Sequence, residues 1–194
     1  MASPVNPMIE ILPERFPVQL ALAYATPDNI VGRPIYRRAA CFLHPHALPL
    51  LERAIALAAA LGLRLKIFDA FRPAEAQWVL WNAAPGSPYV ADPRRGSPHS
   101  RGVALDLTLV DGASGRELDM GTPFDSFEER AHHGYMPLPP SVLRHRSILL
   151  GIMSAAGWDF YSKEWWHYQM FDPRRYPVFS DSAAGTALMA PRTA

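Results

Sequence analysis

The stretch that decides the fold spans residues 97–106 and reads Ser97-Pro98-His99-Ser100-Arg101-Gly102-Val103-Ala104-Leu105-Asp106. Its first half has loop character, because Pro98 lacks an N–H group and Gly102 tolerates unusual backbone angles. From Val103 onward, apolar and other residues alternate, so that one strand face would carry Val103, Leu105, Leu107 and Leu109. The pattern therefore predicts that His99 lies on a loop and that Asp106 points from the opposite, polar face of a strand.

His99 and Asp106 offer two kinds of metal-binding atom. A neutral imidazole nitrogen and a carboxylate oxygen are two of the three protein ligands that a catalytic zinc ion needs. The third ligand must come from elsewhere, and the best candidate is His167 in Glu164-Trp165-Trp166-His167. Gly157 ends the preceding helix, and the aromatic residues after it favour a strand that contains His167.

Glu164 lies three residues before His167, and this spacing leaves two alternatives open. On one regular strand the two side chains would point to opposite faces, so Glu164 must lie in the turn before the strand or a bulge must intervene. A helix would place both side chains on one face directly. The density of aromatic residues favours the strand.

The bulk composition describes a globular protein. The chain has 194 residues, 49% of them hydrophobic and 19% charged, which suits one domain with a real core. A net charge of +1 gives no reason to expect nucleic acid or an acidic membrane surface as a partner. No stretch is long and apolar enough to span a membrane, and no signal peptide is visible at the N-terminus.

The single cysteine, Cys41, excludes an internal disulfide framework and fits a reducing compartment. A cytoplasmic location follows as an expectation, and a homo-oligomer is compatible with the sequence. We interpret Cys41 as a small buried apolar residue rather than a nucleophile. We also interpret the pair His44 and His46 as surface or capping residues, and we leave the adjacent His132 and His133 outside the metal site.

Periodicity predicts the other elements. Helices are expected over residues 47–61, from 74 to about 84 and over 140–156, with a short helix over 127–133. Residues 63–68 alternate as a strand that leads to Arg72, so this arginine stands at a strand end. A turn near residues 111–115 connects the Asp106 strand to a short following strand. The whole chain, residues 1–194, reads as one domain with a loose tail from about residue 180.

Several of these stretches together resemble a known family. They are Tyr24-Ala25-Thr26-x-Asp28-Asn29, Asp69-x-x-Arg72-Pro73, the His99–Asp106 stretch extended to Leu109, Met120-Gly121-x-x-Phe124-Asp125, and Glu164-Trp165-Trp166-His167-Tyr168. The chain resembles the zinc D-alanyl-D-alanine dipeptidases of the vancomycin-resistance type, within a wider group of D,D-carboxypeptidases and hedgehog-like domains. The resemblance extends from about residue 20 to residue 175.

The resemblance implies roles for the residues in these motifs. His99, Asp106 and His167 would hold one zinc ion per chain, Glu164 would be the general base and Arg72 would stabilise the oxyanion. Asp125 would bind the ammonium group of the dipeptide, and the remaining substrate contacts would come from Ser97, Tyr24 and Asp69. The reaction would be hydrolysis of D-Ala-D-Ala to free D-alanine, with a small dipeptide as the partner.

The fold implied is a single α+β domain with a mainly antiparallel central sheet, helices packed on one face and the zinc site on the other. Two alternatives remain: a murein carboxypeptidase or endopeptidase with a more open groove, and a hedgehog-like zinc domain without catalysis. The chain departs from the family where Ala70-Phe71 replaces a frequent Gly-Tyr, and where the loop over residues 85–97 is shorter. Both departures bear on substrate preference rather than on the metal ligands.

Overall fold

The computed structural model describes residues 7–189. Its centre is a five-stranded sheet in the order β2-β4-β5-β7-β6. The strands are β2 (Gln19–Leu20), β4 (Leu63–Asp69), β5 (Ala104–Asp111), β6 (Asp159–Phe160) and β7 (His167–Gln169). Only the β2–β4 pair is parallel, so the expected antiparallel sheet is confirmed. A separate antiparallel pair joins β1 (Ile9–Glu10) to β3 (Phe42–Leu43).

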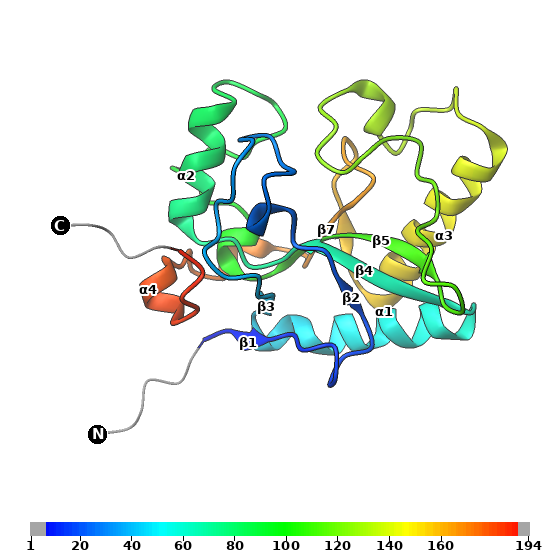
Figure 1. Cartoon of the computed structure of the whole chain (residues 1–194), viewed down its shortest axis with the longest axis horizontal. Helices are drawn as coiled ribbons and strands as arrows, with labels where there is room; N and C mark the ends of the chain where they lie inside the picture. The colour runs from blue at the N-terminus through cyan, green and yellow to red at the C-terminus, as the bar shows by residue number, and fades with distance from the viewer. Residues whose placement is uncertain (1–6, 190–194) are drawn as a thin grey trace.

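Two long helices cover one face of this sheet. Helix α1 (Leu48–Ala60) lies below the sheet in Figure 1, and α3 (Pro140–Ala156) lies at its right. The alternating apolar residues of β5 point into the core between sheet and helices, where Leu105, Leu107 and Leu109 are fully buried. Gly157 ends α3 in the left-handed conformation, as its position in the sequence predicts.

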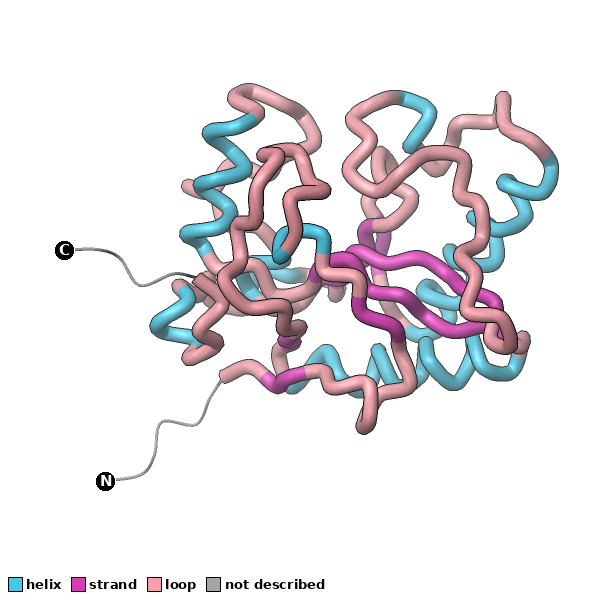
Figure 2. The backbone as a smooth tube through the Cα atoms, viewed as in Figure 1, coloured by secondary structure: helices cyan, strands magenta, loops and turns pink. Residues whose placement is uncertain are grey.

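Helix α2 (Ala74–Ala83) departs from the expected arrangement of helices on one face. It stands on the other side of the sheet, at the upper left of Figures 1 and 2, where it borders the candidate site. Its apolar side chains form a second cluster with residues from the N-terminal part of the chain, among them Tyr36, Phe42 and Phe71. The chain therefore has a main core beneath the sheet and a smaller one beside the site.

The C-terminal segment also differs from expectation. Residues 181–184 form the short helix α4, and Ala184 and Leu188 are fully buried in the second cluster. Asp181 accepts hydrogen bonds from Thr186 Oγ1 and the Leu188 and Met189 amides. A loose tail from residue 180 is therefore wrong as far as residue 189, and residues 190–194 lie outside the described part. Small and polar composition concealed this packing, because the cluster that buries Ala184 and Leu188 is formed by residues elsewhere in the chain.

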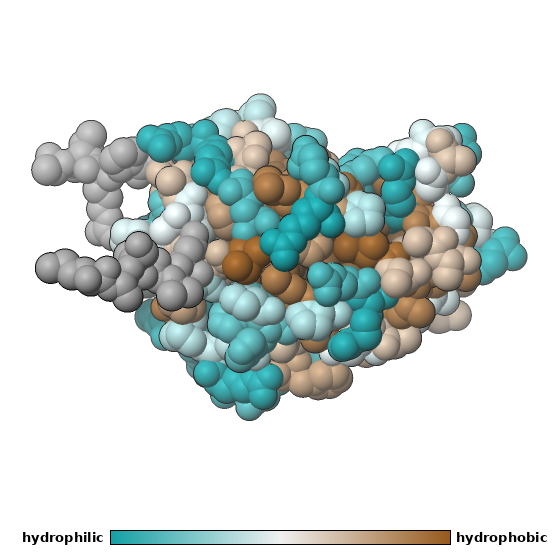
Figure 3. Space-filling view, turned by 90° about the horizontal axis from the view of Figure 1, so that it is seen from below, coloured by the Kyte–Doolittle hydropathy of each residue, from teal (hydrophilic) through white to brown (hydrophobic). Residues whose placement is uncertain are grey.

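Two other elements differ less from the expectations of the sequence analysis. The expected short helix over 127–133 is a single 3-10 turn, η4 (Glu129–Ala131), and the strand expected after the 111–115 turn is one isolated bridge between Val110 and Glu117. Further 3-10 turns are η1 (Ala23–Ala25), η2 (Pro45–Ala47), η3 (His99–Arg101) and η5 (Pro173–Arg175). Within the described residues no helix is long and apolar enough to cross a membrane. Figure 3 views the side on which α1 lies, with hydrophobic residues in its centre and hydrophilic residues around them.

Gly102 is the point where the candidate ligand loop joins β5. Its φ is +70°, and a Cβ atom placed on it would lie 2.5 Å from Met8 Sδ and 3.1 Å from the backbone nitrogen of His44. Gly102 also accepts the His44 amide through its own carbonyl group. A side chain at residue 102 would therefore combine backbone strain with a close contact.

We expect Gly102→Ala to destabilise the fold more than Gly86→Ala, which has a similar φ of +75° but open space around its Cβ. The left-handed conformation costs about 1–2 kcal/mol at either position, and overpacking adds about 1–3 kcal/mol at residue 102 only. Urea unfolding of both variants measures the difference. Equal losses would show that the chain around Met8 and His44 yields without cost.

Candidate active site and metal centre

Three polar side chains form a row across the sheet. Asp69 of β4 is the register partner of Asp106 in β5, and Asp106 is the partner of His167 in β7. A β-bulge in β4, between Ile67 and Asp69, shifts the register so that Asp69 rather than Phe68 faces Asp106. The row lies on the face opposite to α1 and α3, because Leu105 and Leu107 on either side of Asp106 point into the main core.

His99 reaches this row from the neighbouring turn. It begins η3, which Gly102 closes in the left-handed conformation, and the Arg72 amide donates to the His99 carbonyl at 3.1 Å. His99 is 3% exposed, Asp106 is 2% exposed and His167 is 7% exposed. The loop and strand positions expected for His99, Asp106 and His167 are thus found, and tertiary contacts bring the three together.

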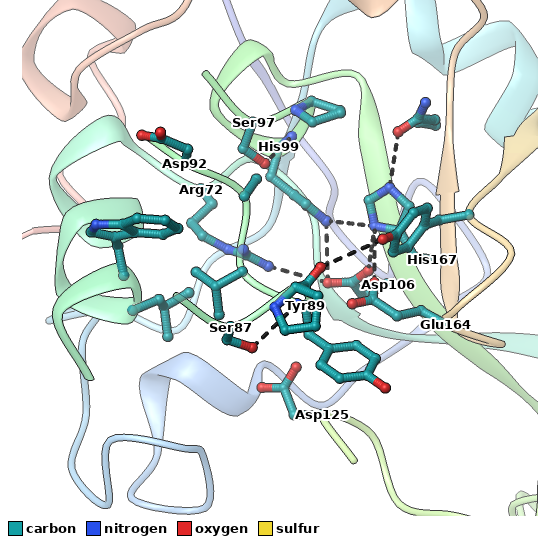
Figure 4. Close-up of a pocket in the computed structure, with 18 of the residues that line it drawn as sticks. Arg72, Ser87, Tyr89, Asp92, Ser97, His99, Asp106, Asp125, Glu164 and His167 are labelled. Atoms are coloured by element: carbon teal, nitrogen blue, oxygen red, sulfur yellow. Dashed lines mark hydrogen bonds and ion pairs between the residues drawn. The ribbon is translucent and has the colours of Figure 1, made fainter. Parts of the chain in front are cut away.

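The facing atoms of these three side chains form a compact donor set. His99 Nε2 lies 3.1 Å from His167 Nδ1 and 3.2 Å from Asp106 Oδ2, and His167 Nδ1 lies 3.1 Å from Asp106 Oδ1. Within the described chain, these residues alone form a cluster of three or more potential metal ligands within 4.8 Å of one another. Figure 4 shows the two imidazole rings and the carboxylate converging on one point.

Each imidazole has one inner nitrogen, which faces the cluster, and one outer nitrogen, which faces away from it. The partner of the outer nitrogen determines which nitrogen carries the proton. His99 Nδ1 lies 2.7 Å from the Ala70 carbonyl oxygen and His167 Nε2 lies 3.1 Å from Gln169 Oε1, both of which are acceptors. Each outer nitrogen therefore carries the proton of a neutral ring, and each inner nitrogen presents a lone pair. Two lone pairs and a carboxylate at such distances repel one another unless a cation lies between them. The donor set therefore fits a metal ion.

Glu164 lies beside this set without belonging to it. It sits in the turn between β6 and β7, so the helical alternative is wrong and the turn alternative is confirmed. Its carboxylate is 4.0 Å from His167 Nδ1 and, among the described residues, makes no hydrogen bond. The residue is 7% exposed, and burial raises the pKa of Glu164 to about 8.

Arg72 connects the two buried aspartates. Its Nε donates to Asp69 Oδ2 at 2.8 Å, its Nη2 to Asp106 Oδ2 at 3.2 Å, and its Nη1 to Gln77 Oε1 at 3.1 Å. Asp69 also accepts from Tyr36 Oη at 2.8 Å and is 1% exposed. Asp69 does not line the pocket, so direct contact with a substrate does not fit its position. Its contacts instead orient the guanidinium group of Arg72.

Asp125 and Tyr24 meet on another wall of the site. Tyr24 Oη donates to Asp125 Oδ2 at 2.8 Å, although 101 residues separate them. Asp125 has a φ of +59°, and the neighbouring Phe124 packs against Phe68 and Trp166. Burial, together with the nearby charge of Asp106, raises the pKa of Asp125 to about 7.

These groups line one pocket of about 670 Å³. It contains the three candidate ligands together with Arg72, Tyr24, Ser97, Asp125 and Glu164. Ser97 is buried, and its Oγ accepts the His99 amide at 3.2 Å, which leaves the hydroxyl hydrogen free to donate. Phe71, in contrast, lies in the second hydrophobic cluster and does not line the pocket.

Comparison with known proteins agrees with this arrangement. The sequence profile of a family described as D-ala-D-ala dipeptidase matches residues 5–182. The chain belongs to this family. It is similar to the D-alanyl-D-alanine dipeptidase of Escherichia coli K12, at 44% identity over 84% of each chain. It is also similar to the dipeptidase of that name from Enterococcus faecalis, at 33% identity over 77% of this chain and 84% of the relative.

Membership in this dipeptidase family makes the chain a peptidase.

Three residues that the sequence analysis did not identify support the site through hydrogen bonds. Gln77 holds Arg72, Gln169 holds His167, and Tyr36 holds Asp69. Gln169 lies two residues after His167 on the same strand face, which is a signal that the sequence contains. Gln77 and Tyr36 carry no such signal. Of the other histidines, His132 pairs with Tyr89, and His44 caps η2 as expected.

We expect one metal ion per chain and its loss in His99→Ala and His167→Ala, because either change removes one of three converging donors. His46→Ala is the matched control, since His46 bonds Tyr176 Oη outside the cluster. Elemental analysis of the purified proteins measures the metal content. Full occupancy in a His99 or His167 variant would remove that residue from the ligand set.

Proposed function

We propose that this protein is a zinc-dependent dipeptidase that hydrolyses D-Ala-D-Ala to two molecules of D-alanine. The relatives with this name support the substrate. The observation that carries the proposal is the buried carboxylate of Glu164, which makes no hydrogen bond within residues 7–189 and lies 4.0 Å from a candidate metal ligand in the pocket. A metal site that only stabilises a fold or binds a partner needs no such group.

His99, Asp106 and His167 would hold the zinc ion through two imidazole nitrogens and one carboxylate. Three protein ligands of this type are the usual set of a catalytic zinc site, which keeps a further position open. When bound, zinc supplies Lewis acidity and lowers the pKa of a coordinated water to about 7. Ala70 and Gln169 accept the outer imidazole protons and thereby keep both rings in the ligating tautomer.

Glu164 is proposed as the general base and then the general acid. It takes a proton from the attacking water as the water oxygen bonds to the peptide carbon, and gives a proton to the amine nitrogen as the C–N bond breaks. Burial raises the pKa of Glu164, and the positive charge of a bound metal ion would act in the opposite direction, so that the group can both take and give a proton near neutral pH. Trp166 and Tyr161 line the same pocket as Glu164.

Arg72 is proposed to stabilise the negative charge that develops on the carbonyl oxygen. Asp69 and Gln77 hold two edges of its guanidinium group, and this fixed orientation avoids reorganisation during the reaction. Asp69 thus serves the site through Arg72 rather than by contact with substrate. Arg72 lies between the end of β4 and the start of α2, and its amide donates a hydrogen bond to the His99 carbonyl.

The two ends of a dipeptide need opposite partners. Asp125, with Tyr24 bonded to it, is proposed to bind the ammonium group, and the Ser97 hydroxyl is proposed as one donor to the carboxylate. Burial of either charged end without a partner would be costly. A site that binds both charged ends accepts a dipeptide but not a longer peptide, whose amino group would lie elsewhere. This selectivity disfavours the carboxypeptidase alternative. The cytoplasmic location and the oligomeric state stay predictions.

We expect Glu164→Gln to retain its metal but lose about 10²–10⁴-fold in kcat for D-Ala-D-Ala, because the amide cannot transfer protons. Glu52→Gln on the exposed side of α1 is the matched control and should behave as the unchanged protein. Release of D-alanine and metal analysis give the two readouts. Near-normal turnover of Glu164→Gln would exclude a proton-transfer role for this residue.

The role of Asp125 predicts discrimination against a blocked amino group. N-acetyl-D-Ala-D-Ala should be a poor substrate, because acetylation removes the positive charge that Asp125 would bind. Asp125→Asn should lower kcat/KM for the free dipeptide, with the metal content unchanged. The expected loss of transition-state stabilisation is roughly 2–5 kcal/mol. Efficient hydrolysis of the acetylated dipeptide or of a peptidoglycan pentapeptide would favour a carboxypeptidase instead.

A further inference from the structure

The loop over residues 120–132, called here the Asp125 loop, carries Asp125 to the pocket and ends before α3. Its two ends lie close together and meet one side chain of α3, Arg146. Arg146 Nε donates to the Met120 carbonyl at 2.7 Å, Nη2 to the Arg130 carbonyl at 2.9 Å, and Nη1 to the His132 carbonyl at 3.1 Å. One planar group therefore joins both ends of the loop to the helix.

Arg146 has no carboxylate partner among the described residues. It is 4% exposed, and burial lowers the pKa of Arg146 to about 10, so that it remains charged at neutral pH. A buried cation is costly unless its hydrogen bonds are satisfied. Here three backbone carbonyl groups accept one hydrogen bond from each of its three nitrogen atoms. Lysine could not reproduce this arrangement, because its ammonium group is a point donor without the planar fork of arginine.

Other contacts hold the same loop against the turn that carries Glu164. Trp165 Nε1 donates to Thr122 Oγ1 at 2.8 Å, and the Trp165 amide donates to the Ala131 carbonyl at 3.1 Å. Gly121 packs so closely on α3 that a Cβ atom there would lie 2.8 Å from Val142 Cγ1. The positive φ of Asp125 persists only where the surrounding structure enforces it.

We propose that Arg146 is a positioning residue that sets where the Asp125 carboxylate lies relative to Glu164 and the metal donor set. The proposal rests on the function given above, in which Asp125 binds the substrate ammonium group. Arg146 does not line the pocket and touches no candidate ligand, so it acts through the loop. Because Asp125 would hold the ammonium group before and during the reaction, displacement of the loop affects KM more than kcat.

The test compares Arg146→Lys with Arg144→Lys, an exposed arginine on the same helix. Arg146→Lys should lower kcat/KM for D-Ala-D-Ala about 10- to 100-fold, the range expected of a misplaced binding group, mostly through KM and with full metal content. Arg144→Lys should change neither constant. Equal kinetics of the two variants, or a loss confined to kcat, would overturn the proposal.

A double variant separates positioning from a general loss of structure. If Arg146 acts through Asp125, adding Arg146→Lys to Asp125→Asn should reduce kcat/KM by less than threefold further. If the losses of the two single variants instead multiply in the double variant, Arg146 only stabilises the fold.

Should Arg146→Lys fail to fold, Gly121→Ala displaces the same end of the loop and should show the same KM effect and the same coupling to Asp125. Absence of D-Ala-D-Ala hydrolysis by the unchanged protein would instead contradict the proposed function itself.

Discussion

The site depends on the burial of two carboxylates on neighbouring strands. Asp69 and Asp106 are register partners, and each is almost completely removed from solvent. Like charges directly opposite one another destabilise a sheet, so this pair requires compensation. The guanidinium group of Arg72 bonds to both, and Tyr36 donates to Asp69. The bulge in β4 and the start of α2 after Pro73 place Arg72 where it can do this. On the other side of Asp106, two imidazole lone pairs leave room for a second positive charge.

The same pocket holds carboxylates in different states. Asp106 accepts a hydrogen bond from the Arg72 guanidinium group, whereas burial raises the pKa values of Glu164 and Asp125 to about 8 and about 7. Environment therefore separates chemically similar groups into a metal ligand, a proton carrier and a binding partner for an ammonium group, the roles proposed here. Their positions on three different segments make this separation possible, because each segment supplies its own degree of burial and its own neighbours.

The loop after α2 and the Asp125 loop both border the pocket. Tyr89, in the loop after α2, stacks on Phe127 at 5.1 Å between ring centroids, and its hydroxyl lies 3.1 Å from His132 Nε2. The Asp125 loop thus contacts the α2 side of the pocket at its tip and α3 at its two ends.

The local patterns of the sequence determined the strands and helices and the character of the candidate ligands. Alternation from Val103 to Leu109 identified β5 and the face of Asp106, Gly157 marked the end of α3, and aromatic density placed His167 in a strand. Tertiary structure alone decided the rest. The β4 bulge that turns Asp69 toward Asp106, the supports Tyr36 and Gln77, the packed segment around Leu188 and the position of Arg146 all depend on partners distant in the chain. Periodicity and turn propensity report only on neighbouring residues, whereas a register shift or a buried hydrogen bond is fixed by the free energy of contacts that form when the whole chain folds.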